Sequence, residues 1–223
     1  MEQNPYTAPA ETAPNIRGPY GVFRKNGALR NVFAFLVIVD SMVIVFAAIL
    51  FFSGKSSIVA NSANAPVQTF VQSLLIAQIA ARLLSFVIFP AWLNRACKNA
   101  WMLDAPHIQT TPGWAAGYCF IPFLNLWKPY VVMKQIRRAS YASDRALSKL
   151  LVCWWTAWLV FIAIGLATAI IGADSVIDEQ TEEILTKLRA IRIPISLALN
   201  FLALALIVCI TRAQNQRFSE WQL

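Results

Sequence analysis

TPGWAAGYCFIPFLNLWKPY, at residues 111–130, is apolar enough to enter a membrane, but Pro122, Asn125, Lys128 and Pro129 interrupt it. Proline removes a backbone hydrogen-bond donor and breaks a helix. Broken backbone at membrane depth must be buried in protein or line a cavity, because lipid offers no hydrogen bonds. The pattern therefore predicts a re-entrant or interfacial helical hairpin over 111–130 rather than a plain spanning helix.

The rest of the chain has the composition of a membrane protein. Of its 223 residues, 58% are hydrophobic and only 13% are charged. A soluble domain is usually about half apolar and a quarter charged. Crossing a bilayer takes roughly 20 apolar residues. We therefore predict an all-α membrane protein with four transmembrane helices, at about 31–53, 69–94, 150–172 and 190–211.

The distribution of basic residues predicts the orientation of these spans. Most lysines and arginines lie before the first span, between the second and third, and after the fourth. Membrane proteins keep such residues on the cytoplasmic side. We therefore predict a multi-pass membrane protein with both termini cytoplasmic. A flexible tail over 1–30 precedes a four-span domain over 31–212, and a short tail over 213–223 follows it. An additional span at 113–127 would invert the charge bias.

A basic amphipathic helix is predicted over 130–141, directly after the hairpin. Its apolar residues share one arc, and Lys134, Arg137 and Arg138 share the opposite arc. Helices of this kind lie among lipid head groups, so membrane lipids, anionic ones in particular, are expected partners of these three side chains. A simple connection between two spans would have the same geometry, and this alternative stays open.

Charged and polar side chains inside the spans form a second candidate site. Asp40 and Arg82 lie at similar depths of the first and second spans, with Gln78 one turn from Arg82 and Asn200 at a similar depth of the fourth. An unpaired charge costs at least about 2.5–3.5 kcal/mol at the bilayer centre, so we predict an Asp40–Arg82 ion pair. The cluster is either a ligand site or ion path, or a pair that fixes helix register.

The hairpin supplies the other candidate binding residues, which are Asn125, Trp127 and Lys128. Near the end of the second span, Arg95 and Asn99 share a helix face that emerges level with the hairpin. Broken helices leave backbone carbonyls without partners. We therefore predict that Arg95 and Asn99 satisfy carbonyls of the hairpin.

No pattern in the sequence predicts catalysis, a metal or a cofactor. The catalytic motifs of common hydrolases, metalloproteases and nucleotide-binding enzymes are missing. The four cysteines lack the paired spacing of a zinc site or a disulfide framework. No nucleic-acid-binding motif accompanies the net charge of +8, so we expect no nucleic-acid partner.

Two stretches resemble a known family. They are WLNRACKNA at 92–100 and the segment 111–140, which contain W-x-x-R-A-x-x-N, P-G-W and F-x-P-x-x-N-L-W-K-P-Y. These motifs resemble the bacterial membrane family called domain of unknown function 4328. The resemblance implies that the protein resides in the bacterial cytoplasmic (inner) membrane, and it implies no chemistry.

Three classes of function stay open. The first is a lipid- or protein-binding or scaffolding protein that uses the hairpin and the basic helix. The second is a small transporter or channel, which would need to be a homo-oligomer because four spans alone form a poor pore. The third, a lipid-modifying enzyme, is the least favoured, since the catalytic set is missing.

Overall fold

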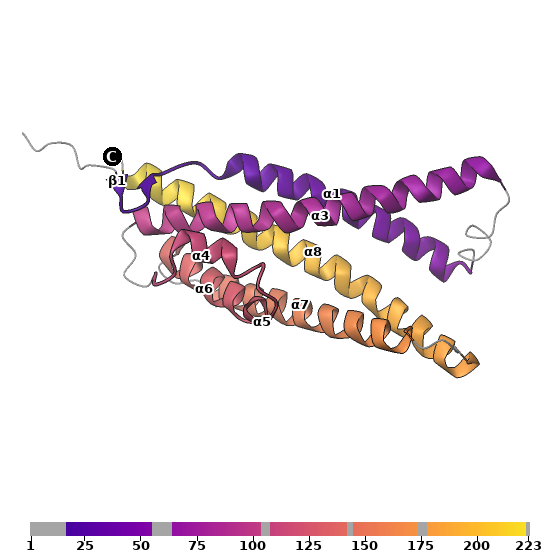
Figure 1. Cartoon of the computed structure of the whole chain (residues 1–223). Coiled ribbons are helices and arrows are strands. Elements are labelled where there is room, and N and C mark those ends of the chain that lie inside the picture. Colours follow the sequence, from indigo (N-terminus) through magenta and orange to yellow (C-terminus); the bar gives the residue numbers. More distant parts are fainter. Residues whose placement is uncertain (1–16, 55–63, 104–107, 142–144, 174–177, 222–223) are drawn as a thin grey trace, which may run out of the picture.

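The computed structural model describes residues 17–54, 64–103, 108–141, 145–173 and 178–221 as a bundle of helices (Figure 1). Within these residues, four helices are long and apolar enough to cross a membrane. They are α1 (Gly27–Phe52), α3 (Ala65–Met102), α7 (Arg145–Ile171) and α8 (Glu179–Trp221). The prediction of an all-α, multi-pass membrane protein with four spans is therefore confirmed.

The four long helices form two antiparallel pairs. α1 packs on α3, α7 packs on α8, and contacts between α1 and α8 join the pairs. The pairs lie close together where α8 ends and splay apart toward the opposite end (Figure 1). We call the end that holds the N-terminus of α1 and the C-terminus of α8 the terminal end.

Three short helices lie at the terminal end, in the segment between α3 and α7. They are α4 (Pro112–Gly117), α5 (Pro122–Asn125) and α6 (Lys128–Ser140). Each has a proline in its first two positions, where the missing backbone N–H has no helical partner to lose. α4 packs on α3, and α6 packs on α3, α7 and α8. The segment therefore folds back on itself beside the bundle and does not form a fifth long helix.

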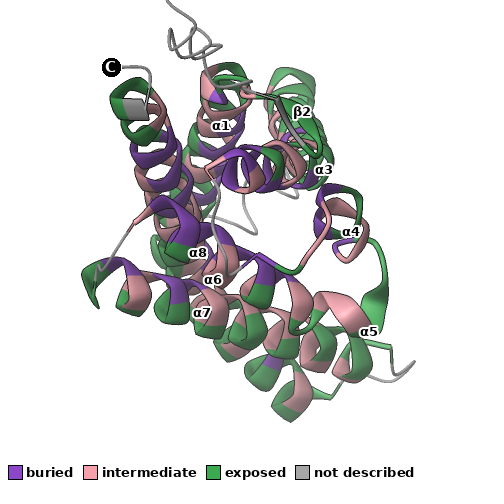
Figure 2. Ribbon diagram, turned by 90° about the vertical axis from the view of Figure 1, so that its left-hand side faces the viewer, coloured by how far each residue is buried: buried purple, intermediate pink, exposed green. Residues whose placement is uncertain are grey.

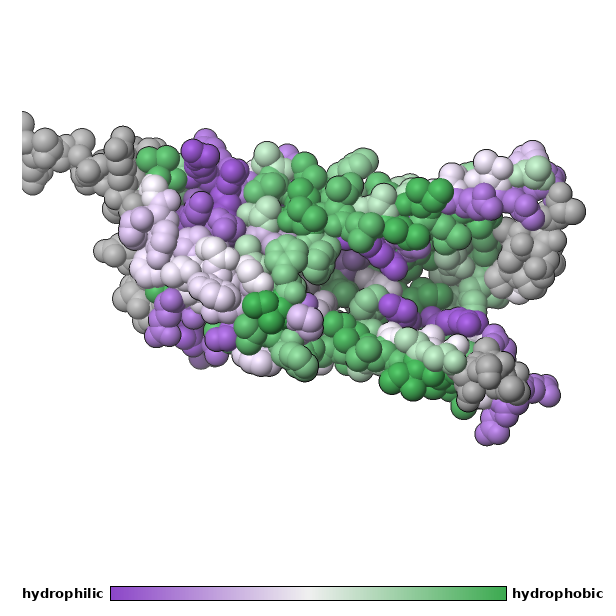
Figure 3. All heavy atoms as spheres, viewed as in Figure 1, coloured by the Kyte–Doolittle hydropathy of each residue, from purple (hydrophilic) through white to green (hydrophobic). Residues whose placement is uncertain are grey.

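The core is concentrated near the terminal end, where purple ribbon marks α3, α6 and α8 (Figure 2). Trp92, Leu93, Ile136 and Ile207 are fully buried there. Elsewhere the long helices expose apolar side chains such as Phe35, which is 65% exposed. These side chains form the green band across the middle of the molecule (Figure 3). An exposed apolar surface of this extent is typical of helices that face lipid.

The predicted tails differ from the structure at both ends. Two short strands, β1 (Arg17–Gly18) and β2 (Gly21–Val22), form a hairpin, and Gly21, directly after its turn, has a positive φ of 104°, which glycine adopts readily. α1 begins at Gly27, earlier than predicted, and buried Asn26 donates a hydrogen bond to the backbone oxygen of Trp92. Residues 1–16 of the predicted flexible tail lie outside the described residues.

At the other end, helix α8 continues through most of the predicted tail over 213–223. Gln214 is buried in this extension, and its side-chain amide nitrogen, Nε2, donates a 2.9 Å hydrogen bond to the backbone oxygen of Ala96. Helix α3 likewise runs beyond residue 94, to Met102. Hydropathy marks only the apolar part of each helix, whereas polar side chains with buried partners extend the helices further.

Candidate functional site

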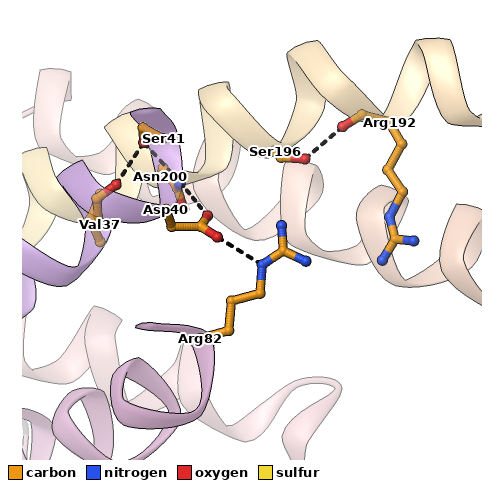
Figure 4. Close-up of polar contacts among 7 residues, drawn as sticks. All are labelled: Val37, Asp40, Ser41, Arg82, Arg192, Ser196 and Asn200. Carbon is orange, nitrogen blue, oxygen red and sulfur yellow. Dashed lines mark hydrogen bonds and ion pairs between the residues drawn. The ribbon is translucent and has the colours of Figure 1, made fainter. Parts of the chain in front are cut away.

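Asp40 is the centre of a polar cluster that joins three long helices (Figure 4). Its Oδ1 accepts a hydrogen bond from Arg82 Nε at 2.8 Å, and its Oδ2 accepts one from Asn200 Nδ2 at 2.9 Å. Asn200 Nδ2 also lies 3.0 Å from Ser41 Oγ. The structure thus brings together three of the four predicted residues. Gln78 lines a small cavity beside Arg82 instead.

A cavity of about 310 Å³ adjoins this cluster, and we call it the lateral cavity. Between the α1–α3 pair and the α7–α8 pair, the surface is hollowed (Figure 3). The polar lining consists of Asp40, Arg82, Ser85, Asn125, Ser196 and Asn200. Much of the apolar lining is aromatic and comes from Phe86, Phe89, Trp154, Trp155, Trp158 and Phe161. The site therefore combines an aromatic wall with one charged pair and a few neutral polar groups.

Three tryptophans of α7 form much of the aromatic wall. The ring centroids of Trp154 and Trp155 are 5.5 Å apart, and those of Trp155 and Trp158 are 4.8 Å apart. Phe89 of α3 continues the row, with its ring centroid 5.9 Å from that of Trp154. Contacts at these spacings hold large rings in defined positions, so the wall has a fixed shape.

The segment between α3 and α7 closes part of the lateral cavity. Asn125 and Cys119 line it, whereas Trp127 is 47% exposed and outside the lining. Lys128 Nζ lies 5.2 Å from the ring centroid of Tyr118. Of the predicted hairpin residues, Asn125 thus joins the intramembrane cluster in one site, and the other two do not.

A family model described as "Domain of unknown function (DUF4328)" matches residues 56–214. The chain belongs to the DUF4328 family. The matched region includes every part of the lateral cavity except the wall provided by α1. No curated protein and no solved structure matches the chain. Membership of DUF4328 therefore supports the fold and leaves the chemistry to be argued from the site.

The W-x-x-R-A-x-x-N stretch, which carries the DUF4328 resemblance, holds the terminal end together. Trp92 Nε1 donates a 3.1 Å hydrogen bond to Thr211 Oγ1 of α8. The backbone oxygen of Ala96 accepts the bond from Gln214 described above. Both contacts are buried and join α3 to the last turns of α8. We infer a structural role for these two positions of the stretch.

The predicted partners of Asn99 were wrong. Its Nδ2 donates to the backbone oxygen of Arg24 at 2.9 Å, and its Oδ1 accepts from the backbone N–H of Arg24 at 3.2 Å. Asn99 thus binds the segment before α1 and not the backbone carbonyls of the predicted helical hairpin over 111–130. Asn94 donates to one of them, the backbone oxygen of Pro112, at 3.0 Å. Arg95 lines a separate open cavity, together with Arg24.

The basic helix of this DUF4328 member also differs from its prediction in one residue. Arg137 is only 8% exposed, because α3, α7 and α8 all pack on α6. Its guanidinium is therefore not on a face that lipid head groups can reach. Arg138 is exposed and Lys134 is half-buried. Two of the three predicted lipid contacts thus keep access to solvent or head groups.

Within the described part of the chain, no group of three or more His, Cys, Asp or Glu side chains could hold a metal ion. The cysteines described there are free thiols, with Cys97 and Cys119 buried and Cys153 exposed. The lateral cavity therefore offers aromatic contact, hydrogen bonding and charge as its means of recognition.

Proposed function

We propose that this protein binds a membrane amphiphile in the lateral cavity, with the apolar part of the ligand against the aromatic wall. The observation that carries the proposal is the division of the cavity into an aromatic side and a polar side. Trp154, Trp155 and Trp158 belong to the first, and the Asp40–Arg82 pair and Asn200 belong to the second. An amphiphile has the same division, whereas a uniformly polar solute would leave the aromatic side without a partner.

The size and position of the cavity support this proposal. About 310 Å³ lies at the lower end of the roughly 300–1,000 Å³ that small-molecule sites occupy. The hollow between the two helix pairs lies within the apolar band of the surface (Figure 3). A ligand in the surrounding bilayer could therefore enter sideways from the acyl-chain region, without first crossing an aqueous phase.

We place the terminal end in the cytoplasm of a bacterium, so that both termini and the basic α6 face inward. The positive-inside rule supports this orientation, because α6, the N-terminus of α7 and the C-terminal turns of α8 lie toward that end (Figure 1) and contain Arg138, Arg145 and Arg212. The segment 112–140 would then re-enter the membrane from the cytoplasmic side and close the lateral cavity there. Dense packing at the terminal end favours a binding protein over a continuous pore.

Quenching of tryptophan fluorescence by brominated amphiphiles tests this function. The protein is placed in nanodiscs of phosphatidylcholine, and 9,10-dibromostearyl chains with different head groups are added at rising mole fraction. Contact with the tryptophans of α7 should give saturable quenching on top of the linear quenching from bulk lipid. Ala203→Phe, which fills the cavity from α8, should abolish the saturable part.

Two further variants make this experiment decisive. Ala163→Phe adds the same side chain at an exposed position of α7 outside the cavity lining, and it should keep saturable quenching. Ser85→Phe fills the cavity from α3 and should behave like Ala203→Phe. Because the two substitutions lie on different helices, the conclusion does not depend on the correct folding of a single variant. Saturable quenching that both filling variants retain would contradict the proposal.

A further inference from the structure

Arg82 shares a second cavity with Arg192 of α8. This cavity, of about 190 Å³, adjoins the lateral cavity, since Arg82, Phe161 and Ser196 line both. The guanidinium groups of Arg82 and Arg192 extend from different helices into one space (Figure 4). Gln78 lies at the edge of the same space. Two cationic forks and one amide thus converge on a small volume beside the aromatic wall.

Much of the hydrogen-bonding capacity of this pair is unused in the described part of the chain. Arg82 donates to Asp40 through Nε alone, so its two Nη groups have no partner there. Arg192 has no carboxylate within 4.0 Å among the described residues, and its guanidinium lies 4.4 Å from the ring centroid of Phe161. Arg189 also lines this cavity, but it is already paired with Glu182.

The charges in this region do not balance. Asp40 compensates Arg82, and nothing in the described residues compensates Arg192. A cation inside or at the edge of a membrane is costly unless an anion or water accompanies it. The guanidinium group binds carboxylates and phosphates through two parallel hydrogen bonds, which a pair of arginines can offer from two sides.

We propose that the ligand carries an anionic head group, a carboxylate or a phosphate, and that this group binds between Arg82 and Arg192. The inference rests on the proposed function and names its ligand class. Arg192 precedes Asn200 by eight positions on α8, which is about 12 Å along a helix at 1.5 Å per residue. The head group therefore lies further from the terminal end, and the apolar chain extends from it toward Trp154 and Asn125.

The quenching assay, with four probes in nanodiscs, tests this head-group preference. Dibromostearate is compared with dibromostearyl alcohol, and dibrominated phosphatidylglycerol with dibrominated phosphatidylcholine. In the wild type, at least one of the two anionic probes should half-saturate the quenching at a mole fraction about tenfold lower than the mole fraction that the other probe of its pair, which has no net negative charge, requires. The pair that shows the difference identifies the source as a fatty acid or a phospholipid.

Substitutions then test whether Arg192 causes the preference for the anionic probe. Arg192→Gln should remove the tenfold difference while the probe without net charge still binds, and Arg192→Lys should keep part of it. Lys187→Gln removes the same charge five positions earlier on α8, at a side chain that is 68% exposed, and it should leave the difference intact. Retention of the full preference in Arg192→Gln overturns the proposed site.

The two proposals fail in different ways. Equal saturable quenching by the anionic probe and its partner in the wild type overturns the head-group inference and supports amphiphile binding. The absence of saturable quenching by all four probes overturns the proposed function itself, and the inference with it.

Discussion

Replacing Asp40 by asparagine removes the carboxylate that compensates Arg82 and leaves a side chain of nearly the same shape. The side chain of Asp40 is 10% exposed, and it accepts hydrogen bonds from both Arg82 and Asn200. Removing one partner of a buried ion pair costs roughly 3–5 kcal/mol, because the other charge loses its compensation. The Arg82 side chain is 48% exposed, so we take the lower end, about 3 kcal/mol.

This loss should be measurable as a lower melting temperature. A chain of this length loses about 2–4 °C of Tm for each kcal/mol, so Asp40→Asn should lower Tm by about 6–12 °C. Intrinsic tryptophan fluorescence of the detergent-solubilised protein during heating provides the measurement. As a control, Glu183→Gln removes one partner of an exposed pair with Lys187 and should cost at most about 1 kcal/mol.

The double variant Asp40→Asn, Arg82→Gln decides between direct pairing and independent roles. Without Arg82 no unpaired charge is left in the cluster, so the double variant should be more stable than Asp40→Asn alone. If the losses of the two single variants instead add up in the double variant to within about 0.5 kcal/mol, the two side chains act independently and the argument from charge compensation is refuted.

Two other predictions concern the terminal end. Asn99→Ala removes both hydrogen bonds to the backbone of Arg24 and should lower the free energy of unfolding by about 1–3 kcal/mol, whereas Lys98→Ala beside it should have little effect in the same melting assay. For topology, single cysteines at Gln109 and Glu183, introduced after the native cysteines are removed, should react with an impermeant maleimide from opposite faces of the membrane. Labelling of both positions from one face would exclude the orientation proposed above.

The features that could be predicted from the sequence are those with a large energetic signal. Runs of about 20 apolar residues predict spans, because few other structures accommodate them. Asp40, Arg82 and Asn200 could be grouped because charges within spans need partners at their own depth. The proline spacing of 112–129 likewise predicts interrupted helices at this point of the chain.

The contacts that could not be predicted depend on the relative rotation of the helices. Asn94 and Asn99 are close in sequence, yet Asn94 binds the backbone of Pro112 and Asn99 binds the backbone of Arg24. Periodicity assigns such residues to a face without saying which segment covers it. The partner of Asn99 is 75 residues away, in a segment whose polar composition resembles that of an unstructured tail.

The splayed arrangement of the two helix pairs has a consequence for the surrounding bilayer. The two pairs lie close together at the terminal end, where α4, α5 and α6 also pack, and they stand apart at the other end (Figure 1). In the orientation proposed above, acyl chains of the outer leaflet therefore have space between the two pairs. In the inner leaflet, the short helices fill the corresponding space with protein.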